Sequence, residues 1–285
     1  MRRICILVVS LWLGASRLIP AQAPVIWTDE EKPIVDQIRG LRKVPDEQRA
    51  DVTRKVARQI RNLSSPRQVM LASALAGLAT EGDYGKDTLQ EVAATLAAAL
   101  TSNPPRRGEP VPDPAYVTLA EYARYEHVHV SLDDEQMKAA FAKLDENDKV
   151  RQDASFKLTD LLGKSWTLKG LRGSVVLVNF WATWCPPCRK EMPDLEALYR
   201  RFQEQGLVIL AISSEQEDIV RKFLADKQYT YPILLDTGET VMKEYAIEGI
   251  PKSFLYDRQG KLVAQAIDMR TRRQFIEMLA EAGLK

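Results

Sequence analysis

Two cysteines in the C-terminal half of the chain have the spacing of a redox pair. Cys185 and Cys188 are separated by Pro186 and Pro187, and the apolar run Val175–Trp181 before them predicts a buried strand. A helical pattern follows, so both thiols should lie in the first turn of a helix. The unpaired backbone N–H groups and the dipole at a helix N-terminus favour a thiolate, which is the form that attacks disulfides. The second thiol can then resolve the mixed disulfide that the first has formed.

A zinc half-site and a structural disulfide are the alternatives to redox chemistry. Zinc requires four ligands. The one further cysteine, Cys5, stands in an N-terminal targeting pattern, and the two histidines, His127 and His129, are distant in sequence. A disulfide across two intervening residues constrains the unfolded chain little. The pattern therefore favours redox chemistry, and we expect neither a metal site nor a cofactor.

The position of each cysteine predicts its role. We expect Cys185 to be the nucleophile, because it stands at the exposed start of the helix. Cys188 falls about one turn further in, where it should be shielded and act as the resolving thiol. Trp184, Pro186 and Pro187 flank the nucleophile and are candidate substrate-binding residues.

The stretch NFWATWCPPCRKEMP resembles the active site of the TlpA/ResA branch of the thioredoxin superfamily, which consists of extracytoplasmic thiol–disulfide oxidoreductases. The resemblance includes GIPKSFLYDRQGKLV and covers about Ala154–Lys285, but not the residues before it. It implies a thioredoxin fold with a redox-active Cys185–Cys188 disulfide. It also implies that Ile250–Pro251 is a cis peptide facing the pair, and that Ile250 pairs with the extended backbone of the substrate.

The chain departs from this family pattern at the proton acceptor. Thioredoxin carries a buried aspartate at the position of Asn179, and several relatives of ResA place a glutamate where Thr167 stands. Neither acid is present here. The sequence therefore identifies no group to take the proton from Cys188, and we expect a water chain or an acid from the N-terminal half to substitute.

The C-terminal half, residues 151–285, alternates strand and helix patterns, which suits a mixed sheet with helices on both faces. The predicted strands are Phe156–Thr159, Ser165–Leu168, Val175–Trp181, Leu207–Ser213, Tyr231–Leu235, Ser253–Tyr256 and Lys261–Ile267. The predicted helices after the CxxC helix are Gln216–Lys227, Glu239–Tyr245 and Thr271–Ala282.

Residues 24–150 have only helical periodicity and predict an all-α domain, whose role the sequence does not indicate. Thr28 to Glu31 fits a capping box at its start, and the last predicted helix is Asp133–Asp145. The alanine-rich helix Leu89–Leu100 is expected to be a packing surface, because small side chains allow close helix–helix approach.

Residues 1–23 have the layout of a secretory signal: two arginines, an apolar run and then small residues. Pro24 follows the small-residue site, so an uncleaved anchor is the alternative. We therefore expect an exported, periplasmic or extracytoplasmic protein. The net charge of +1 gives no basic excess for binding nucleic acid.

The expected function is reduction of disulfides in exported proteins. The resemblance favours this direction, with cysteine-containing proteins such as apocytochrome c as candidate substrates and a membrane or extracytoplasmic thiol as electron donor. A disulfide-forming oxidant and a redox-switched partner-binding module are the alternatives.

Overall fold

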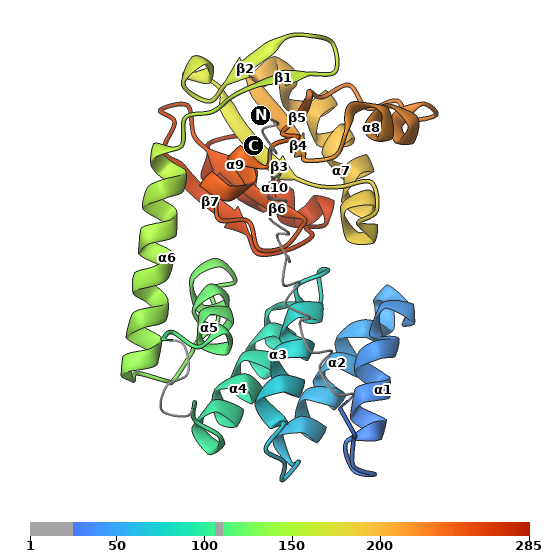
Figure 1. Cartoon of the computed structure of the whole chain (residues 1–285), viewed down its shortest axis with the longest axis vertical. Helices are drawn as coiled ribbons and strands as arrows, with labels where there is room; N and C mark the ends of the chain where they lie inside the picture. The colour runs from blue at the N-terminus through green and yellow to red at the C-terminus, as the bar shows by residue number, and fades with distance from the viewer. Residues whose placement is uncertain (1–24, 106–110) are drawn as a thin grey trace, which may run out of the picture.

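A computed structural model of the chain describes residues 25–105 and 111–285, so the predicted signal segment 1–23 lies outside the described residues. Figure 1 shows a helical region, α1 to α6, and a sheet region that runs from β1 to α10; α1 to α5 lie below the sheet region and α6 reaches up along its side. Among the described residues, no helix is both long enough and apolar enough to cross a membrane.

The helical region begins where the capping pattern predicts. The Thr28 N–H donates to Glu31 Oε2 at 2.9 Å and the Glu31 N–H donates to Thr28 Oγ1 at 3.3 Å, which confirms the capping box. The helices are α1 (Lys32–Gly40), α2 (Asp46–Arg61), α3 (Gln68–Ala79), α4 (Lys86–Ser102), α5 (Pro114–Tyr125) and α6 (Glu135–Asp153).

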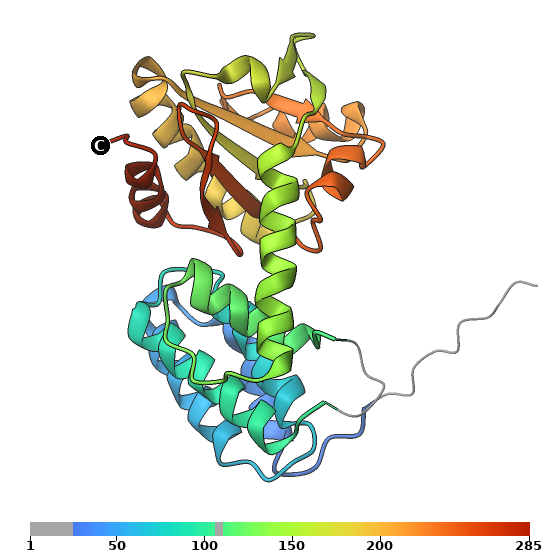
Figure 2. The ribbon, with the colours of Figure 1, turned by 90° about the vertical axis from the view of Figure 1, so that its left-hand side faces the viewer.

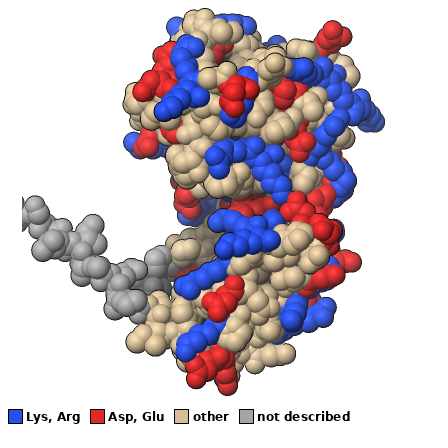
Figure 3. All heavy atoms as spheres, turned by 90° about the vertical axis from the view of Figure 1, so that its right-hand side faces the viewer, with Lys and Arg blue, Asp and Glu red and all other residues tan. Residues whose placement is uncertain are grey.

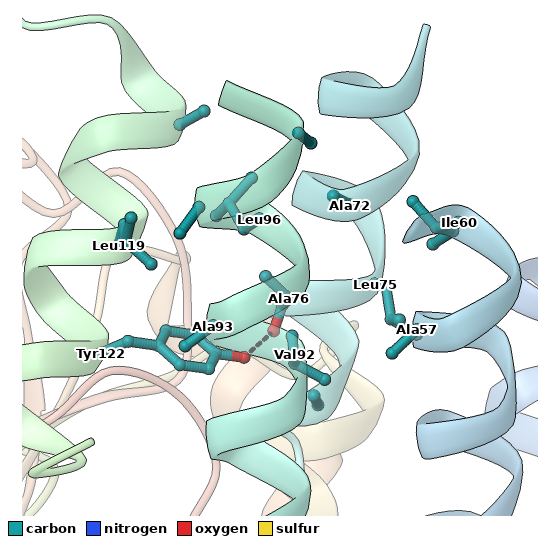
Figure 4. Packing of buried hydrophobic residues seen from close by; sticks show 14 of the residues in the cluster. Ala57, Ile60, Ala72, Leu75, Ala76, Val92, Ala93, Leu96, Leu119 and Tyr122 are labelled. Atoms are coloured by element: carbon teal, nitrogen blue, oxygen red, sulfur yellow. Dashed lines mark hydrogen bonds between the residues drawn. The ribbon is translucent and has the colours of Figure 1, made fainter. Parts of the chain in front are cut away.

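The core of the helical region is built on small residues of α3 and α4. Ala76 and Ala93 are each 1% exposed, and they let neighbouring helices approach closely (Figure 4). Tyr122 reaches across from α5, and its hydroxyl donates to the Ala76 carbonyl at 2.6 Å. The predicted packing role of the alanine-rich helix is therefore confirmed.

Helix α6 is longer than the sequence predicted and connects the two regions. The predicted end at Asp145 is wrong, because the helix continues to Asp153; Glu146, Lys149 and Arg151 in this stretch are good helix formers. Figure 2 shows α6 running from the helical region up to the sheet region. Near its end Arg151 is buried, and its Nε donates to the Tyr245 carbonyl at 3.1 Å. The predicted domain boundary at 150/151 thus falls inside one helix.

The sheet region contains a seven-stranded mixed sheet with the order β2-β1-β5-β4-β3-β6-β7. Strand β3 pairs in parallel with β4 and antiparallel with β6, and β4 pairs in parallel with β5. The strands are β1 (Lys157–Asp160), β2 (Ser165–Thr167), β3 (Val175–Phe180), β4 (Leu207–Ser213), β5 (Ile233–Leu235), β6 (Lys252–Tyr256) and β7 (Leu262–Ala266).

Alternate residues of the central strands face opposite cores, because side chains in a strand alternate between the two faces. On one face Val175 and Leu177 pack with residues of α7 (Pro186–Phe202), α8 (Glu217–Leu224) and α10 (Arg272–Glu281). On the other face Val176 and Val178 pack with residues of α9 (Thr240–Glu244) and with Ala154 and Phe156, which follow α6. The predicted thioredoxin-type sheet with helices on both faces is confirmed.

Ion pairs also connect the two regions. The most buried joins Glu126, just after α5, to Arg270, just before α10; the side chains are 7% and 5% exposed, and two contacts of 2.5 and 3.2 Å join them. Figure 3 shows charged side chains of both signs gathered along the waist between the regions. The more exposed pairs across this waist are Asp46–Lys190, Asp83–Arg273, Glu121–Lys252 and Lys143–Glu248.

Glu126→Ala is expected to destabilise the protein by about 3–5 kcal/mol, because it leaves the buried Arg270 guanidinium without its partner. Chemical denaturation measures this loss. Glu277→Ala is the matched control, because it breaks an ion pair with Arg273 in which both side chains are about 60% exposed; such pairs contribute less than about 1 kcal/mol. Equal, small losses in both variants would show that the Glu126–Arg270 pair does not hold the regions together.

Candidate active site

The two cysteines of the motif form a disulfide at the N-terminus of α7. Their sulfur atoms are 2.02 Å apart. Cys185 is the N-cap residue, and the Cys188 N–H points at Cys185 Sγ from 3.2 Å. Once the disulfide is reduced, this N–H group and the helix dipole would stabilise negative charge on Cys185.

The environment of Cys185 differs from the expectation in one respect. It is only 2% exposed and Cys188 is fully buried, so the prediction of an exposed Cys185 is wrong for this oxidised form. The reason is the loop before β6, which covers the pair: the Ile250 carbonyl oxygen lies 3.7 Å from Cys185 Sγ. Trp184, by contrast, is 69% exposed beside the pair.

The other predicted contact residues surround the disulfide. The Ile250–Pro251 peptide is cis, as the family resemblance implied. It directly precedes β6, which is the antiparallel neighbour of β3. Pro186 is exposed and Pro187 half-buried in the first turn of α7. The structure therefore brings together every residue predicted for the site.

A buried glutamate on α7 stands one helical turn after Cys188. Glu191 is 2% exposed and stands three residues after Cys188, on the same helix face. Its carboxylate accepts hydrogen bonds from Asn179 Nδ2 at 2.8 Å and from the Arg270 N–H at 3.2 Å. Burial outweighs these bonds and raises the pKa of the Glu191 carboxyl to about 8.

This buried acid lies on α7 in the sheet region, whereas an acid from the N-terminal half was expected. Asn179 is not itself an acid, but its amide positions the Glu191 carboxylate by donating a hydrogen bond to it. The same amide donates to Ser253 Oγ at 3.0 Å, and this second bond fixes its orientation. Thr167 lies in β2, and β1, β5 and β4 separate it from β3. At strand spacings of ~4.8 Å that is roughly 19 Å from β3, the strand that leads into the cysteine motif, so an acid at Thr167 would lie well away from the motif.

The loop before the motif is held by a second carboxylate. Glu215, just after β4, accepts hydrogen bonds from the Thr183 N–H at 2.6 Å and from the Thr183 hydroxyl at 2.7 Å. These bonds fix the segment between β3 and Cys185. The disulfide is therefore held between a hydrogen-bonded loop and the N-terminus of α7.

Comparison with known proteins identifies the sheet region. The AhpC/TSA family matches residues 150–265. The thiol-disulfide oxidoreductase ResA of Bacillus thuringiensis (strain Al Hakam) is 40% identical over 121 residues, which are 42% of this chain and 70% of the relative. The ResA of Bacillus cereus (strain ATCC 10987 / NRS 248) is 36% identical over 140 residues, which are 49% of this chain and 81% of the relative. The chain belongs to the ResA family of thiol-disulfide oxidoreductases.

Two solved structures are also similar to the sheet region. StoA from Bacillus subtilis is 31% identical with a TM-score of 0.40, and the match covers 44% of this chain and 96% of StoA. A thiol:disulfide interchange protein from Chlorobium tepidum TLS is 30% identical with a TM-score of 0.42, and the match covers 45% of this chain and 92% of that protein.

Membership of this family makes the chain an enzyme of thiol–disulfide exchange, as the sequence predicted. The AhpC/TSA match begins at residue 150, close to the end of α6. Helices α1 to α5 therefore lie outside that match, although two of them contact the sheet region: Asp46 of α2 pairs with Lys190 and Glu121 of α5 pairs with Lys252.

Proposed function

We propose that the chain reduces disulfides in exported proteins, with Cys185 as the nucleophile and Cys188 as the resolving thiol. The observation that carries this proposal is the position of Cys185 at the N-cap of α7, with the Cys188 N–H 3.2 Å from its sulfur. A thiolate is the reactive species in disulfide exchange, and this position stabilises one on Cys185.

The reaction then has two exchange steps. The Cys185 thiolate attacks one sulfur of the substrate disulfide; a mixed disulfide forms, and the other substrate sulfur leaves as a thiolate that takes a proton from water. Cys188 next loses its proton and attacks Cys185 Sγ, which releases the second substrate thiol. The substrate gains two electrons and two protons, and the enzyme is left with the Cys185–Cys188 disulfide.

Glu191 is the group that takes the proton from Cys188 in the second step. It lies one helical turn from Cys188 and is shielded from water. A general base works best when its pKa is close to the working pH, and the Glu191 pKa of about 8 meets this condition.

The substrate contacts follow from the surroundings of Cys185. Trp184, Pro186 and Pro187 present the surface on the solvent side, and Ile250 with Pro251 presents the opposite side. The Ile250 backbone would pair with the extended substrate chain, as the family resemblance implies. This arrangement favours polypeptides over small disulfides as substrates.

The cellular setting is the part of the proposal that rests most on the family. The signal-like residues 1–23 support export to a periplasmic or extracytoplasmic site, either released or tethered by an uncleaved N-terminus. Apocytochrome c is a candidate substrate, which would place the enzyme in cytochrome c maturation. Each cycle ends with an oxidised enzyme, so a membrane or extracytoplasmic thiol must supply the two electrons.

The reduction potential of the Cys185–Cys188 pair tests the direction of the reaction. A reductase should have a potential near that of thioredoxin, about −270 mV, rather than near that of DsbA, about −120 mV. Equilibration of the protein with glutathione buffers, followed by thiol trapping, measures it. A value above roughly −160 mV would favour the disulfide-forming oxidant, and a reductase-like potential without turnover of any disulfide would favour the redox-switched binding module.

A further inference from the structure

A cavity of about 420 Å³ lies between the helical region and the loop that covers the disulfide. Gly249, Ile250 and Pro251 line it from the sheet region, and residues of α3, α5 and α6 line it from the helical region, among them Gly77 and Thr118. Its volume falls in the range of pockets that bind small ligands, about 300–1,000 Å³. It therefore has room for a short stretch of peptide but not for a folded domain.

The cavity adjoins the site of chemistry at Ile250. This residue lines the cavity, and its carbonyl oxygen lies 3.7 Å from Cys185 Sγ. Cys185 is 2% exposed and the Ile250–Pro251 loop covers it, so we expect a polypeptide bonded to its sulfur to run along this loop. The part of the polypeptide next to its own cysteine then comes to the mouth of the cavity.

The chemistry of the lining suits a peptide. Val117, Ile250 and Ile267 provide apolar surface for a side chain. Among the other lining residues, Glu121 pairs with Lys252 and Lys143 pairs with Glu248, each at 3.6 Å. Both pairs join the helical region to the sheet region, and their charges balance, so the lining selects neither an acidic nor a basic segment.

We propose that the helical region forms the second wall of the substrate groove, and that this cavity holds the segment of a substrate polypeptide that adjoins the cysteine bonded to Cys185. The proposal rests on the proposed function and assigns a role to helices outside the family match. It predicts that the helical region matters for polypeptide disulfides and not for small ones.

Filling the cavity tests the proposal. Gly77 is exposed on α3, and an added Cβ there would meet no atom within 4 Å, so a larger side chain can be introduced without a clash at its base. Gly77→Trp should lower kcat/KM for reduction of insulin by about tenfold, equivalent to about 1.4 kcal/mol. Reduction of 5,5′-dithiobis(2-nitrobenzoate), a small disulfide, should be unchanged.

Two further variants complete the experiment. Gly40→Trp adds the same bulk at the end of α1, where an added Cβ also meets no atom within 4 Å, and should have no effect. Thr118→Trp fills the cavity from α5 and should repeat the loss with insulin, so the test does not depend on one variant.

The outcomes separate this proposal from the proposed function. If the unmodified protein reduces neither substrate, the proposed function fails. If it reduces both, and Gly77→Trp and Thr118→Trp leave insulin reduction unchanged, the proposed function stands and the proposal that the helical region lines the substrate groove is wrong. Equal losses with insulin and the small disulfide would also overturn it, because damage to the disulfide site itself gives that result.

Discussion

Cys185→Ser is expected to reduce disulfide-exchange activity to the background rate, whereas Cys188→Ser should carry out the first exchange and then stop. Without Cys185 no thiol is available at the N-cap of α7 to attack the substrate. Without Cys188 the Cys185 thiolate still forms a mixed disulfide, but no neighbouring thiol resolves it. The Cys188→Ser protein should therefore accumulate covalent adducts with substrate.

Mass spectrometry under non-reducing conditions detects these adducts, and digestion identifies the bonded cysteine. Cys5→Ser is the control, because it removes the remaining cysteine of the chain and should leave activity unchanged. Alkylation of the reduced, unmodified protein near neutral pH should label Cys185 much faster than Cys188. Adducts on Cys188 in the Cys185→Ser protein, or equal labelling of both thiols, would contradict the assigned roles.

The strand, the motif and the following helix could be predicted because each is encoded locally. The run Val175–Trp181 is apolar at every position except Asn179, as expected for a strand buried on both faces. The break into Cys-Pro-Pro-Cys then marks the helix start. The cis Ile250–Pro251 peptide has no such local signal, and it was anticipated only through the resemblance to a known family.

Glu191 was missed although its signal is local. Cys188, Met192 and Leu195 form the buried face of α7, and Glu191 lies on that face beside them. A carboxyl group at a position that the helical period assigns to the core is costly to bury, which makes it a candidate functional group. The family pattern points only to Asn179 and Thr167, and neither residue is an acid.

The contact between the two regions could not be predicted from local patterns. Glu126 and Arg270 are 144 positions apart in the chain, and nothing in the sequence pairs one with the other. The same holds for the cavity between Gly77 and Ile250. The division into separately folding domains, residues 24–150 and 151–285, stays a prediction. A fragment that begins near residue 150 would test it, although such a fragment cuts through α6.

Glu191→Gln is expected to slow resolution of the mixed disulfide by roughly 100-fold or more, the usual effect of losing a general base. In the unmodified protein the rate of this step should rise with pH and level off above about pH 8, as Glu191 ionises. The variant cannot accept a proton at this position, so its rate should not show this titration. Single-turnover kinetics with a preformed mixed disulfide on Cys185 measures the step.

Glu196→Gln is the matched control for this experiment. Glu196 is also a mostly buried acid of α7, but it accepts hydrogen bonds from Thr230 rather than lying beside the cysteines. Its loss should leave the pH dependence of the resolution step unchanged. If Glu191→Gln behaved like Glu196→Gln, another group or a water chain would have to take the proton from Cys188.

Stability gives a second measure of Glu191 that is independent of turnover. Its pKa rises from 4.5 to about 8 on folding, so the folded form holds a proton that the unfolded form releases between these values. The free energy of unfolding should therefore fall as pH increases from about 4.5 to about 8. Glu191→Gln should lack this part of the decrease. Burial also raises the pKa of Asp268, to about 6. Because Asp268 is present in both proteins, the difference between their stability curves reports Glu191 alone. Parallel stability curves for the two proteins would mean that Glu191 titrates normally and that burial does not hold its proton.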